Sequence, residues 1–421
     1  MDKIVLKNID EIIYHEELKN GLNVYVYPTT LTTSYNIGIL VKVGSNVNKY
    51  NLDGKEISVP NGLEHFLEHL TLKTKDGEAD DFFSSNGSYS NAYTSFNNTY
   101  YYVTSTDNFD VNLEYLVNCI DTPYYTNENV ENEKGIITEE VSMYEQNPYQ
   151  KLSYKLLENV FHNDNNKNKI GGTVSDVKSI TLDDIVNTYN AFYQKDNMAL
   201  IVTGNVDVEH TFNLIKNVEK DKDFNKREVS VINEFEDDSV VKENDIIYDN
   251  VVIPKFSLGI KIPMNKISIP KEKTFLCLYI ILSVLFGRTS NLKVVLEKEN
   301  LISDEIDYSI FKAFNHYVLE IDFDGNNIDK VYSLIKDTIN NETISENDLN
   351  RKKKVLIRHL ISRYENINNV SNSIIANLID YDRVVDNEYE IIESISMDDI
   401  NELFNLIKIS PASNVRLLPK E

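Results

Sequence analysis

The chain has 421 residues, of which 41% are hydrophobic and 26% charged, a composition typical of globular proteins and a length that favours two or more domains. Its 67 acidic and 42 basic residues leave a formal net charge of −25, which argues against a nucleic-acid partner because such binding needs clustered Lys and Arg. An acidic surface favours solubility and can also attract cationic peptides.

The first residues, the apolar stretches and the cysteines of the chain indicate in which cellular compartment it is expected. The first residues carry no basic segment followed by an apolar run, so we expect no signal or transit peptide. The longest apolar stretch, 275–286, is too short to span a bilayer, and we interpret it as a buried helix. The 2 cysteines show no metal-binding or disulfide spacing, which suits a reducing compartment. We therefore expect a cytoplasmic protein without a transmembrane segment.

Strands and helices interleave through the first half of the chain. Apolar residues alternate or run together as in strands at 22–26, 35–43 and 92–104. Helical periodicity predicts helices at 61–72, 108–120, 127–146, 149–161, 181–193 and 207–218. This order favours an α+β fold in which a mainly antiparallel sheet is covered on one side by helices.

The second half repeats features of the first. The segment Ser-Ile-Thr-Leu-Asp-Asp-Ile at 179–185 is echoed by Ser-Ile-Ser-Met-Asp-Asp-Ile at 394–400, about half the chain later, and each copy precedes a helix and a short strand. We therefore expect a duplicated domain. The predicted boundaries are an N-terminal domain at 1–221, a charged linker at 222–245 and a homologous domain at 246–421.

The predicted helix at 61–72 separates two kinds of side chain. An apolar stripe at helical spacing consists of Leu63, Phe66, Leu67 and Leu70. The opposite face carries His65, Glu68 and His69. Two imidazoles four residues apart can share one tetrahedral metal ion, and a neighbouring carboxylate can take a proton from bound water. The alternative is a solvated polar helix face, but with 7 His in 421 residues this spacing is rare by chance.

A third ligand is expected from the helix predicted at 127–146. Its buried face is predicted to contain Val130, Ile136, Ile137, Val141 and Tyr144. Glu133 and Glu140 fall in the centre of this face, whereas Glu139 points away. A carboxylate on an apolar face is costly unless it is paired or bound to a metal. The geometry favours Glu140, or failing that Glu133; the alternative is an ion pair with a buried Lys or Arg.

These residues resemble the pitrilysin and mitochondrial-processing-peptidase family, whose His-x-x-Glu-His motif is followed about 70 to 80 residues later by a glutamate ligand. The matching residues here are His65, Glu68, His69 and Glu140, with further similar segments at 20–26, 44–45, Gly87 with 91–95, and 131–137. The resemblance covers the chain, more strongly in its first half, and is greatest to bacterial members of about this length, including those that trim precursor peptides.

The resemblance implies two homologous domains that form half of a clamshell, with one zinc ion per chain. The implied ligands are His65, His69 and Glu140, with Glu68 as the general base and Glu133 as a carboxylate that orients the site. The implied activity is that of a zinc-dependent endopeptidase acting on peptides or on precursor and leader peptides. The alternative is a non-proteolytic peptide-binding or scaffold subunit, against which the intact motif speaks.

The resemblance also implies a substrate-binding strand. In the family, an extended peptide joins an edge strand through main-chain hydrogen bonds, and side-chain pockets give selectivity. The corresponding residues here are Ser90, Asn91, Ala92, Tyr93 and Thr94. An ordinary sheet edge is an equally open interpretation of this segment.

The second half departs from the family at one motif. Many self-sufficient relatives carry a substrate-holding Arg and Tyr in the pattern Leu-Arg-Glu-x-Gly-Leu-x-Tyr. The corresponding segment, 296–303, has Glu297 and Ser303 at those two positions. In relatives that work as pairs, the zinc motif and the Arg/Tyr pair lie on different subunits. We therefore expect a heterodimer with a homologous subunit that lacks the zinc motif, while a homodimer or a lone active chain remains open.

Overall fold

The computed structural model describes residues 1–220, 222 and 226–420. Contacts group them into two compact units, each assembled from three segments. Unit 1 comprises Met1–Ser142, Lys169–Asn233 and Leu360–Glu388, and unit 2 comprises Met143–Asn168, Glu234–His359 and Tyr389–Glu421. The predicted boundaries at 221 and 246 concern the two halves of the sequence and stay a prediction.

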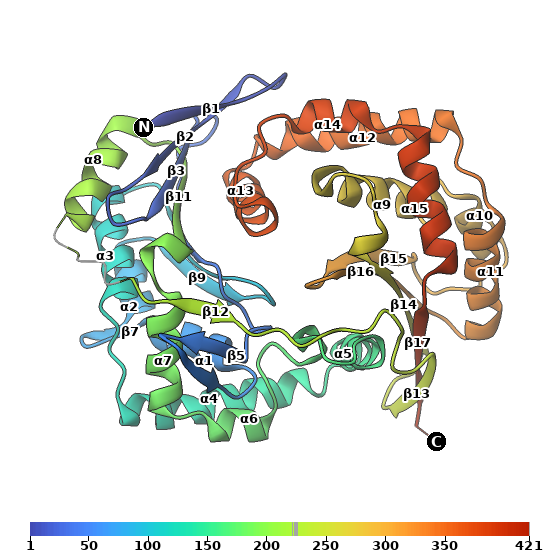
Figure 1. Ribbon diagram of the computed structural model, residues 1–421, viewed down its shortest axis with the longest axis horizontal. Coiled ribbons are helices and arrows are strands. Elements are labelled where there is room, and N and C mark those ends of the chain that lie inside the picture. Colours follow the sequence, from blue (N-terminus) through green and yellow to red (C-terminus); the bar gives the residue numbers. More distant parts are fainter. Residues whose placement is uncertain (221, 223–225, 421) are drawn as a thin grey trace. The chain divides into compact units, whose positions relative to one another are not determined.

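Unit 1 contains a seven-stranded sheet in the order β1-β2-β3-β11-β4-β10-β9, of which Figure 1 labels β1, β2, β3, β11 and β9. The strands are β1 (Asp2–Leu6), β2 (Glu11–Glu17), β3 (Asn23–Pro28), β4 (Tyr35–Val41), β9 (Tyr89–Thr94), β10 (Thr99–Ser105) and β11 (Met198–Gly204). All neighbours are antiparallel except β3 and β11. Every residue of β4 and β11 is buried, as expected for central strands covered on both faces.

Helices cover both faces of this sheet, so the expectation of helices on one side is wrong for unit 1. One layer comprises α1 (Leu63–Thr71), α2 (Ala79–Ser85), α3 (Phe109–Asp121), α4 (Asn127–Tyr144), α6 (Val174–Ser179), α7 (Leu182–Phe192) and α8 (Val208–Glu219), and its apolar residues join the sheet in one core. Helix α13 (Ile367–Tyr381) packs on β11 and β4 from the other side, where the Ser371 hydroxyl lies 3.0 Å from Thr203 Oγ1. Small sheets complete the unit: β12-β5-β6, formed by β5 (Lys49–Leu52), β6 (Lys55–Ser58) and β12 (Val229–Val231), and the pair β7 (Lys73–Thr74) and β8 (Gly77–Glu78).

Unit 2 contains a five-stranded sheet that repeats the main part of the first. Its order is β13-β17-β14-β16-β15, formed by β13 (Asn244–Asp249), β14 (Lys255–Pro263), β15 (Asp307–Lys312), β16 (His316–Asp324) and β17 (Ala412–Pro419). Here too one pair, β13 with β17, is parallel and the others are antiparallel. The pattern matches β3-β11-β4-β10-β9 strand for strand, which confirms the predicted α+β fold with two homologous domains.

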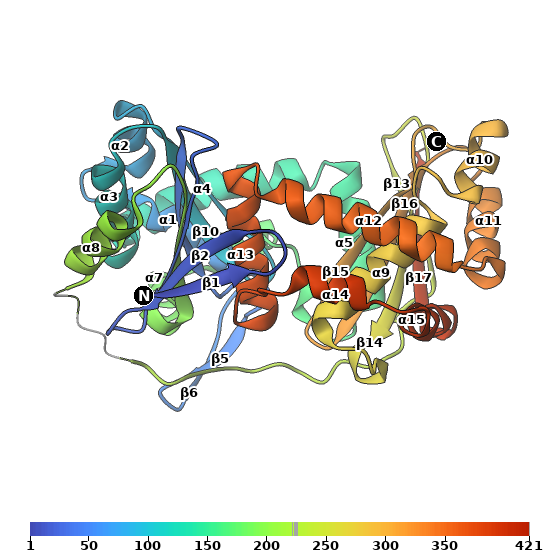
Figure 2. The same cartoon turned by 90° about the horizontal axis from the view of Figure 1, so that it is seen from above.

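The helices of unit 2 also lie against its sheet. Helix α5 (Pro148–Val160) packs on β14 and β17, where Gly259 leaves room for Leu156 and Val160. Helices α9 (Lys271–Leu285) and α15 (Met397–Ile409) contact each other and the sheet (Figure 2). The remaining helices are α10 (Asn291–Lys298), α11 (Ile328–Asn341), α12 (Glu346–Arg363) and α14 (Glu388–Ser394), of which α12 and α14 continue into segments of unit 1.

The repeated sequence segment has a clear local role in both units. Thr181 caps the N-terminus of α7 through a capping box with Asp184, and Ser396 caps α15 through the same arrangement with Asp399. Such boxes satisfy backbone N–H groups that the first helical turn leaves unpaired. The two echoes are therefore equivalent helix starts, followed by the central strands β11 and β17.

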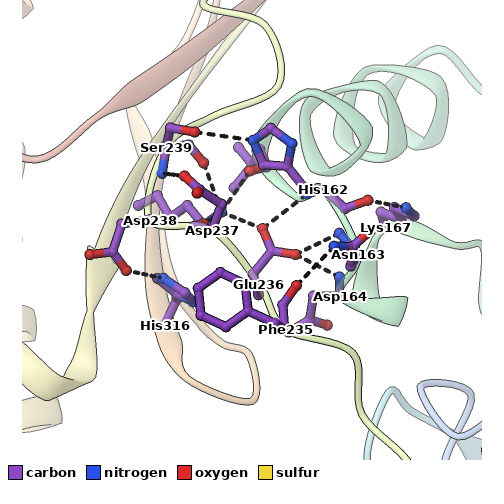
Figure 3. Close-up of polar contacts among 12 residues, drawn as sticks. His162, Asn163, Asp164, Lys167, Phe235, Glu236, Asp237, Asp238, Ser239 and His316 are labelled. Carbon is purple, nitrogen blue, oxygen red and sulfur yellow. Dashed lines mark hydrogen bonds and ion pairs between the residues drawn. The ribbon is translucent and has the colours of Figure 1, made fainter.

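A buried lysine anchors the start of the second half within unit 2. Lys261, on β14, is fully buried and donates to Glu236 and to the carbonyl oxygens of Val160, Asp237 and Ser239. Glu236 also accepts the backbone N–H groups of 162, 163 and 164, as Figure 3 shows. Each charge is thus surrounded by hydrogen-bond partners, the condition under which buried charge is tolerated.

Most predicted helices match observed ones within two residues, but one predicted strand is wrong. The stretch 92–104 forms two strands, β9 and β10, joined by a turn in which Ser95 N donates to Asn98 O at 2.8 Å. The Ser95 hydroxyl also accepts from the N–H groups of Asn97 and Asn98. A turn stabilised by Ser and Asn side chains breaks the strand without Gly or Pro. Across the described residues, no helix is both long and apolar enough to cross a membrane.

Candidate metal centre

Helix α1 presents the histidines at a fixed place beside the sheet. It begins after Gly62, whose φ of 83° is left-handed and whose missing Cβ leaves space for the backbone of Gly171. The predicted apolar stripe, Leu63, Phe66, Leu67 and Leu70, is completely buried. On the other face, the rings of His65 and His69 lie edge to face with centroids 4.7 Å apart. The stripe therefore locks the helix rotation that turns both imidazoles the same way.

Helix α4 supplies the carboxylates that face this pair. Its buried residues are Val130, Glu133, Ile137 and Val141, at spacings of three to four. The expectation that Ile136 and Tyr144 are buried is wrong, since they are 53% and 46% exposed. Ile136 lies about 100° around the helix from Ile137, and Tyr144 is the last residue of the helix. The narrower face still contains Glu133, with Glu140 at its border.

One potential ligand atom from each of His65, His69 and Glu140 lies within 4.8 Å of the others. The Glu140 carboxylate reaches both rings, with Oε1 3.7 Å from His65 Nε2 and Oε2 3.4 Å from His69 Nε2. Among the described residues, no other group of His, Cys, Asp and Glu meets this condition. Two imidazole nitrogens and a carboxylate oxygen are a ligand set that Zn²⁺ takes in catalytic sites, so the residues fit the metal.

The protonation of the two imidazoles differs with their surroundings. Burial lowers the pKa of His65 to about 4, which keeps the ring neutral. Burial is also the largest single influence on His69 and lowers its pKa, but the hydrogen bond to Glu133 and the charges of Glu68, Glu133 and Glu140 together outweigh it and raise the pKa above the ordinary value. A neutral imidazole is the form that binds metals.

Glu133 lies behind the cluster and not within it. Its Oε1 is 2.9 Å from His69 Nδ1, and its Oε2 is 2.8 Å from the Nζ of Lys73. The Glu133 side chain is 2% exposed, and its pKa is lowered because these two partners outweigh the effect of burial. Lys73 also pairs with Glu78, so the small β7–β8 hairpin holds Glu133 in place. Sequence reasoning missed Lys73, which carries no motif and is recognised only by its contact.

Glu68 is beside the cluster and is held by the edge strand. Its side chain is buried, and Thr94 Oγ1 on β9 donates to Glu68 Oε2 at 2.6 Å. Burial raises the pKa of Glu68 above its ordinary value, while the Thr94 hydrogen bond and His69 oppose the rise. The sequence predicts Thr94 only as a substrate-binding residue. The structure adds its hydrogen bond to the carboxylate of Glu68.

The predicted substrate-binding residues all lie on β9. In the sheet order this strand is at an edge, with β10 as its neighbour. Ser90 donates to Asp80 on α2 and Thr94 to Glu68 on α1, so the even-numbered residues face this helical layer. Asn91 and Tyr93 point to the other face, while Ala92 N donates to the Asn91 side chain at 2.8 Å. The structure therefore brings β9, an edge strand of the sheet as far as the described residues show, next to Glu68.

Comparisons with known proteins find matches in both halves of the chain. Residues 24–174 match the model of the insulinase family, peptidase family M16, and residues 179–356 match the model of the M16 inactive domain. A Bacillus subtilis protein named uncharacterized zinc protease YmfH is 35% identical over 292 residues, or 68% of each chain. The β subunit of the Saccharomyces cerevisiae mitochondrial-processing peptidase is 28% identical over 199 residues, which cover 46% of this chain and 41% of that subunit.

Solved structures share the fold. A protease from Helicobacter pylori superposes with a TM-score of 0.81 at 21% identity, covering 97% of this chain and all of the other. The first half of the periplasmic protease PqqL from Escherichia coli gives 0.76 at 18% identity, with 99% of this chain and 93% of that chain covered. With the matches above, these findings confirm the resemblance drawn from the sequence. The chain belongs to the M16 family of peptidases, which includes pitrilysin and the mitochondrial-processing peptidases.

Proposed function

We propose that this chain is a zinc-dependent endopeptidase in which His65, His69 and Glu140 bind one zinc ion per chain. The observation that carries the proposal is the meeting of these three side chains within 4.8 Å, with the buried carboxylate of Glu68 beside them. Relatives named as zinc proteases support the metal and the class of reaction.

Each side chain has a definite task in this mechanism. A bound zinc ion would supply Lewis-acid chemistry, polarising the scissile carbonyl and lowering the pKa of water. Glu68 takes the proton of the attacking water and later returns it to the leaving amine. Thr94 donates to Glu68 Oε2 and thereby fixes the direction of the carboxylate. Glu133 accepts from His69 Nδ1, which leaves the Nε2 lone pair for the metal.

The substrate in this proposal is an extended peptide, including precursor or leader peptides, that adds to β9 along Ser90, Asn91, Ala92, Tyr93 and Thr94. Main-chain hydrogen bonding to a free edge accepts many sequences, as an endopeptidase requires. The Ala92 N–H now donates to Asn91 Oδ1, so a substrate strand would replace that bond with one of its own.

The direct test is to incubate the zinc-loaded chain with a mixed peptide library and to sequence the products. We expect internal cleavage that a chelator stops and added zinc restores. Peptides that bind without being cut, under zinc-replete conditions and with candidate partners present, would instead identify a non-proteolytic peptide-binding subunit.

We also propose that the chain works as the catalytic subunit of a heterodimer. Glu297, on α10, pairs with Lys293 at 3.3 Å, and Ser303 N donates to Asp324 O, so the positions of the family's Arg and Tyr here contribute to the local packing of unit 2. A partner that lacks the zinc motif would supply the missing groups. Correct positioning of a substrate is worth about 7 to 11 kcal/mol in the best cases, so the lone chain should turn over slowly.

Turnover of the zinc-loaded chain alone, and with homologous subunits encoded beside it, tests this assembly. Fast cleavage by the lone chain that no partner increases would contradict it. The proposed location is the cytoplasm, consistent with Cys119 and Cys277 being buried as free thiols. Fractionation of cells that express the tagged full chain would test that location.

A further inference from the structure

The face of β9 that points away from Glu68 carries a row of tyrosines. Cross-strand pairing sets Tyr93 directly opposite Tyr100 on β10, and Asn91 opposite Tyr102. Tyr89 also lies on this side, because residues two apart in a strand share a face. We call Tyr89, Tyr93, Tyr100 and Tyr102 the tyrosine face.

The rings of the tyrosine face form a continuous ladder. Tyr100 and Tyr102 stack with centroids 5.6 Å apart and an interplanar angle of 20°. Tyr93 lies 5.8 Å from Tyr100, and Tyr89 lies 6.4 Å from Tyr102, both with tilted rings. All three distances fall in the range that aromatic pairs prefer. The ladder therefore extends from β10 to the outermost strand of the sheet.

Two features keep the inner part of this ladder in place. A Cβ on Gly38 of β4 would fall on the Tyr100 ring, so the glycine provides the space in which that ring lies. The Tyr100 hydroxyl donates to Asn36 Oδ1 at 3.2 Å, and this asparagine also accepts from Ser371 on α13. Tyr100 is consequently buried, whereas Tyr89 and Tyr93 remain 59% and 38% exposed at the edge.

We infer that the tyrosine face selects substrates with an aromatic side chain, an inference that rests on the proposed function. A strand added to β9 places its side chains alternately on the Glu68 face and on the tyrosine face. Side chains directly opposite each other on paired strands have Cβ atoms about 4.5 to 5.5 Å apart, so a residue opposite Tyr93 or Tyr89 meets an exposed phenol ring. An aromatic ring there continues the ladder by one further pair.

The test measures peptide binding separately from cleavage. The zinc-loaded full chain carrying Glu68→Gln is titrated with peptides of one constant polar sequence in which a single Phe, Leu or Arg is moved along the chain. We expect Phe to bind about two- to fivefold more tightly than Leu at the positions opposite Tyr93 and Tyr89, and to have no advantage at the positions between them. Equal binding of Phe and Leu at every position, or a preference for Arg over Phe, would overturn the inference.

Variants locate the effect on the tyrosine face. Tyr93→Leu keeps apolar bulk at the edge and should remove the Phe preference at one position, while Tyr93→Ala should do so with weaker binding overall. Tyr248→Ala is the control, because Tyr248 is also an exposed tyrosine on an outer strand, β13, of the other sheet. A Phe preference that survives Tyr93→Leu would contradict the assignment.

Hydrolysis by the unmodified chain separates this inference from the proposed function. Selective binding of Phe peptides without their cleavage, with or without a partner subunit, would refute the endopeptidase proposal and leave the aromatic selectivity standing. Cleavage with no difference between Phe and Leu peptides would support the enzyme and refute the selectivity.

Discussion

The two sheets of this protein share one topology, but the helices α1 and α9 that lie beside them differ in the side chains they carry. Helix α1 of unit 1 has a buried stripe and a face with His65, Glu68 and His69. Helix α9 of unit 2 is buried along Cys277, Leu278, Ile280, Ile281 and neighbouring residues, and between Phe275 and Leu285 it has no charged side chain. The same scaffold thus serves packing in one unit and brings together a candidate ligand set in the other, and the difference is a few residues on α1 and α4.

Buried charge also differs between the two units. In unit 2, Lys261 and Glu236 compensate each other and accept or donate backbone hydrogen bonds on every side. In unit 1, the carboxylate of Glu140 faces two imidazoles, and Glu133 is shared between His69 and Lys73. Buried charges that neutralise each other and have all their hydrogen-bond partners serve the fold. Ligand atoms that face one common point are suited to bind a cation there.

Replacing Glu68 by Gln is expected to have the largest effect, because Glu68 is the proposed general base of unit 1. We expect cleavage to fall by about 10²- to 10⁴-fold, because a positioned general base contributes that much, while zinc content stays the same. Kinetics and metal analysis of the same preparation measure both. Glu272→Gln, at the start of α9, is the matched control in unit 2 and should leave both values unchanged. Full activity of the Glu68→Gln variant would remove Glu68 from the mechanism.

Lys261→Met tests the claim that the charges of unit 2 are structural. Removing one member of a buried pair leaves the other uncompensated, so we expect a loss of about 3 to 5 kcal/mol in the free energy of unfolding. Urea unfolding of the full chain measures the loss, and Glu236→Gln in the same chain should restore part of it. Zinc affinity of the folded protein should not change. A stability equal to that of the unmodified chain would show that this pair is not buried as described.

Glu140→Gln and the neighbouring Glu139→Gln separate the two sides of α4. Glu140 faces the imidazoles, whereas Glu139 is exposed on the other side. Loss of a charged ligand should reduce zinc affinity by at least about 100-fold, more than the loss of an outer hydrogen-bond partner. Competition titrations with a zinc chelator give both values. Equal losses in the two variants would mean that the helix presents a different face to the metal.

Much of this site could be predicted because its core is local in sequence. The spacing of His65, Glu68 and His69 on an amphipathic helix fixes their common side, and the seven-residue separation of Glu133 and Glu140 fixes theirs. The helical spacing favoured Glu140 as the third ligand with Glu133 as second choice, and the family resemblance implied Glu140 as well. Whether a carboxylate reaches both imidazole rings depends on the distance between α1 and α4. The periodicity of the sequence gives the faces of the two helices but not the distance between them.

Other features depended on tertiary contacts or turn chemistry. Lys73 and Thr94 are ordinary residues until folding brings them to Glu133 and Glu68. The break between β9 and β10 depends on hydrogen bonds of Ser95, a weaker signal than Gly or Pro. The duplicated topology, by contrast, was visible in two short echoes, because both are capping boxes at equivalent helix starts.

Lys73→Met tests how far the metal site depends on the cation that pairs with Glu133. Groups that hold a ligand's hydrogen-bond partner typically change metal affinity by about 10- to 100-fold, and we expect a loss near the lower end. Lys73→Arg should retain most of the affinity because it keeps the charge. Lys134→Met, which removes a surface ion pair with Glu131 on α4, is the control. An unchanged zinc affinity in Lys73→Met would show that Glu133 keeps its place without the lysine.

The smallest expected effect is a pH dependence carried by the sheet of unit 2. Glu320, on β16, accepts from the Ser309 hydroxyl, and burial together with the charge of Asp322 raises its pKa from 4.5 to about 7. Between these two values the folded chain binds more protons at this group than the unfolded chain does. The contribution of Glu320 to stability is therefore fully present below about pH 4.5 and is lost as the pH rises through about 7. One group changes the unfolding free energy by at most about 1.4 kcal/mol per pH unit, and this side chain is only partly buried, so a smaller slope is expected.

Urea unfolding at several pH values should show a flatter profile of unfolding free energy against pH for Glu320→Gln than for the unmodified chain. Asp304→Asn, at an exposed position, should leave the profile unaltered. If the unfolding free energies of Glu320→Gln and the unmodified chain change with pH in the same way, Glu320 stays ionised in the folded state. Its charge would then be compensated within unit 2 as fully as the charge of Glu236.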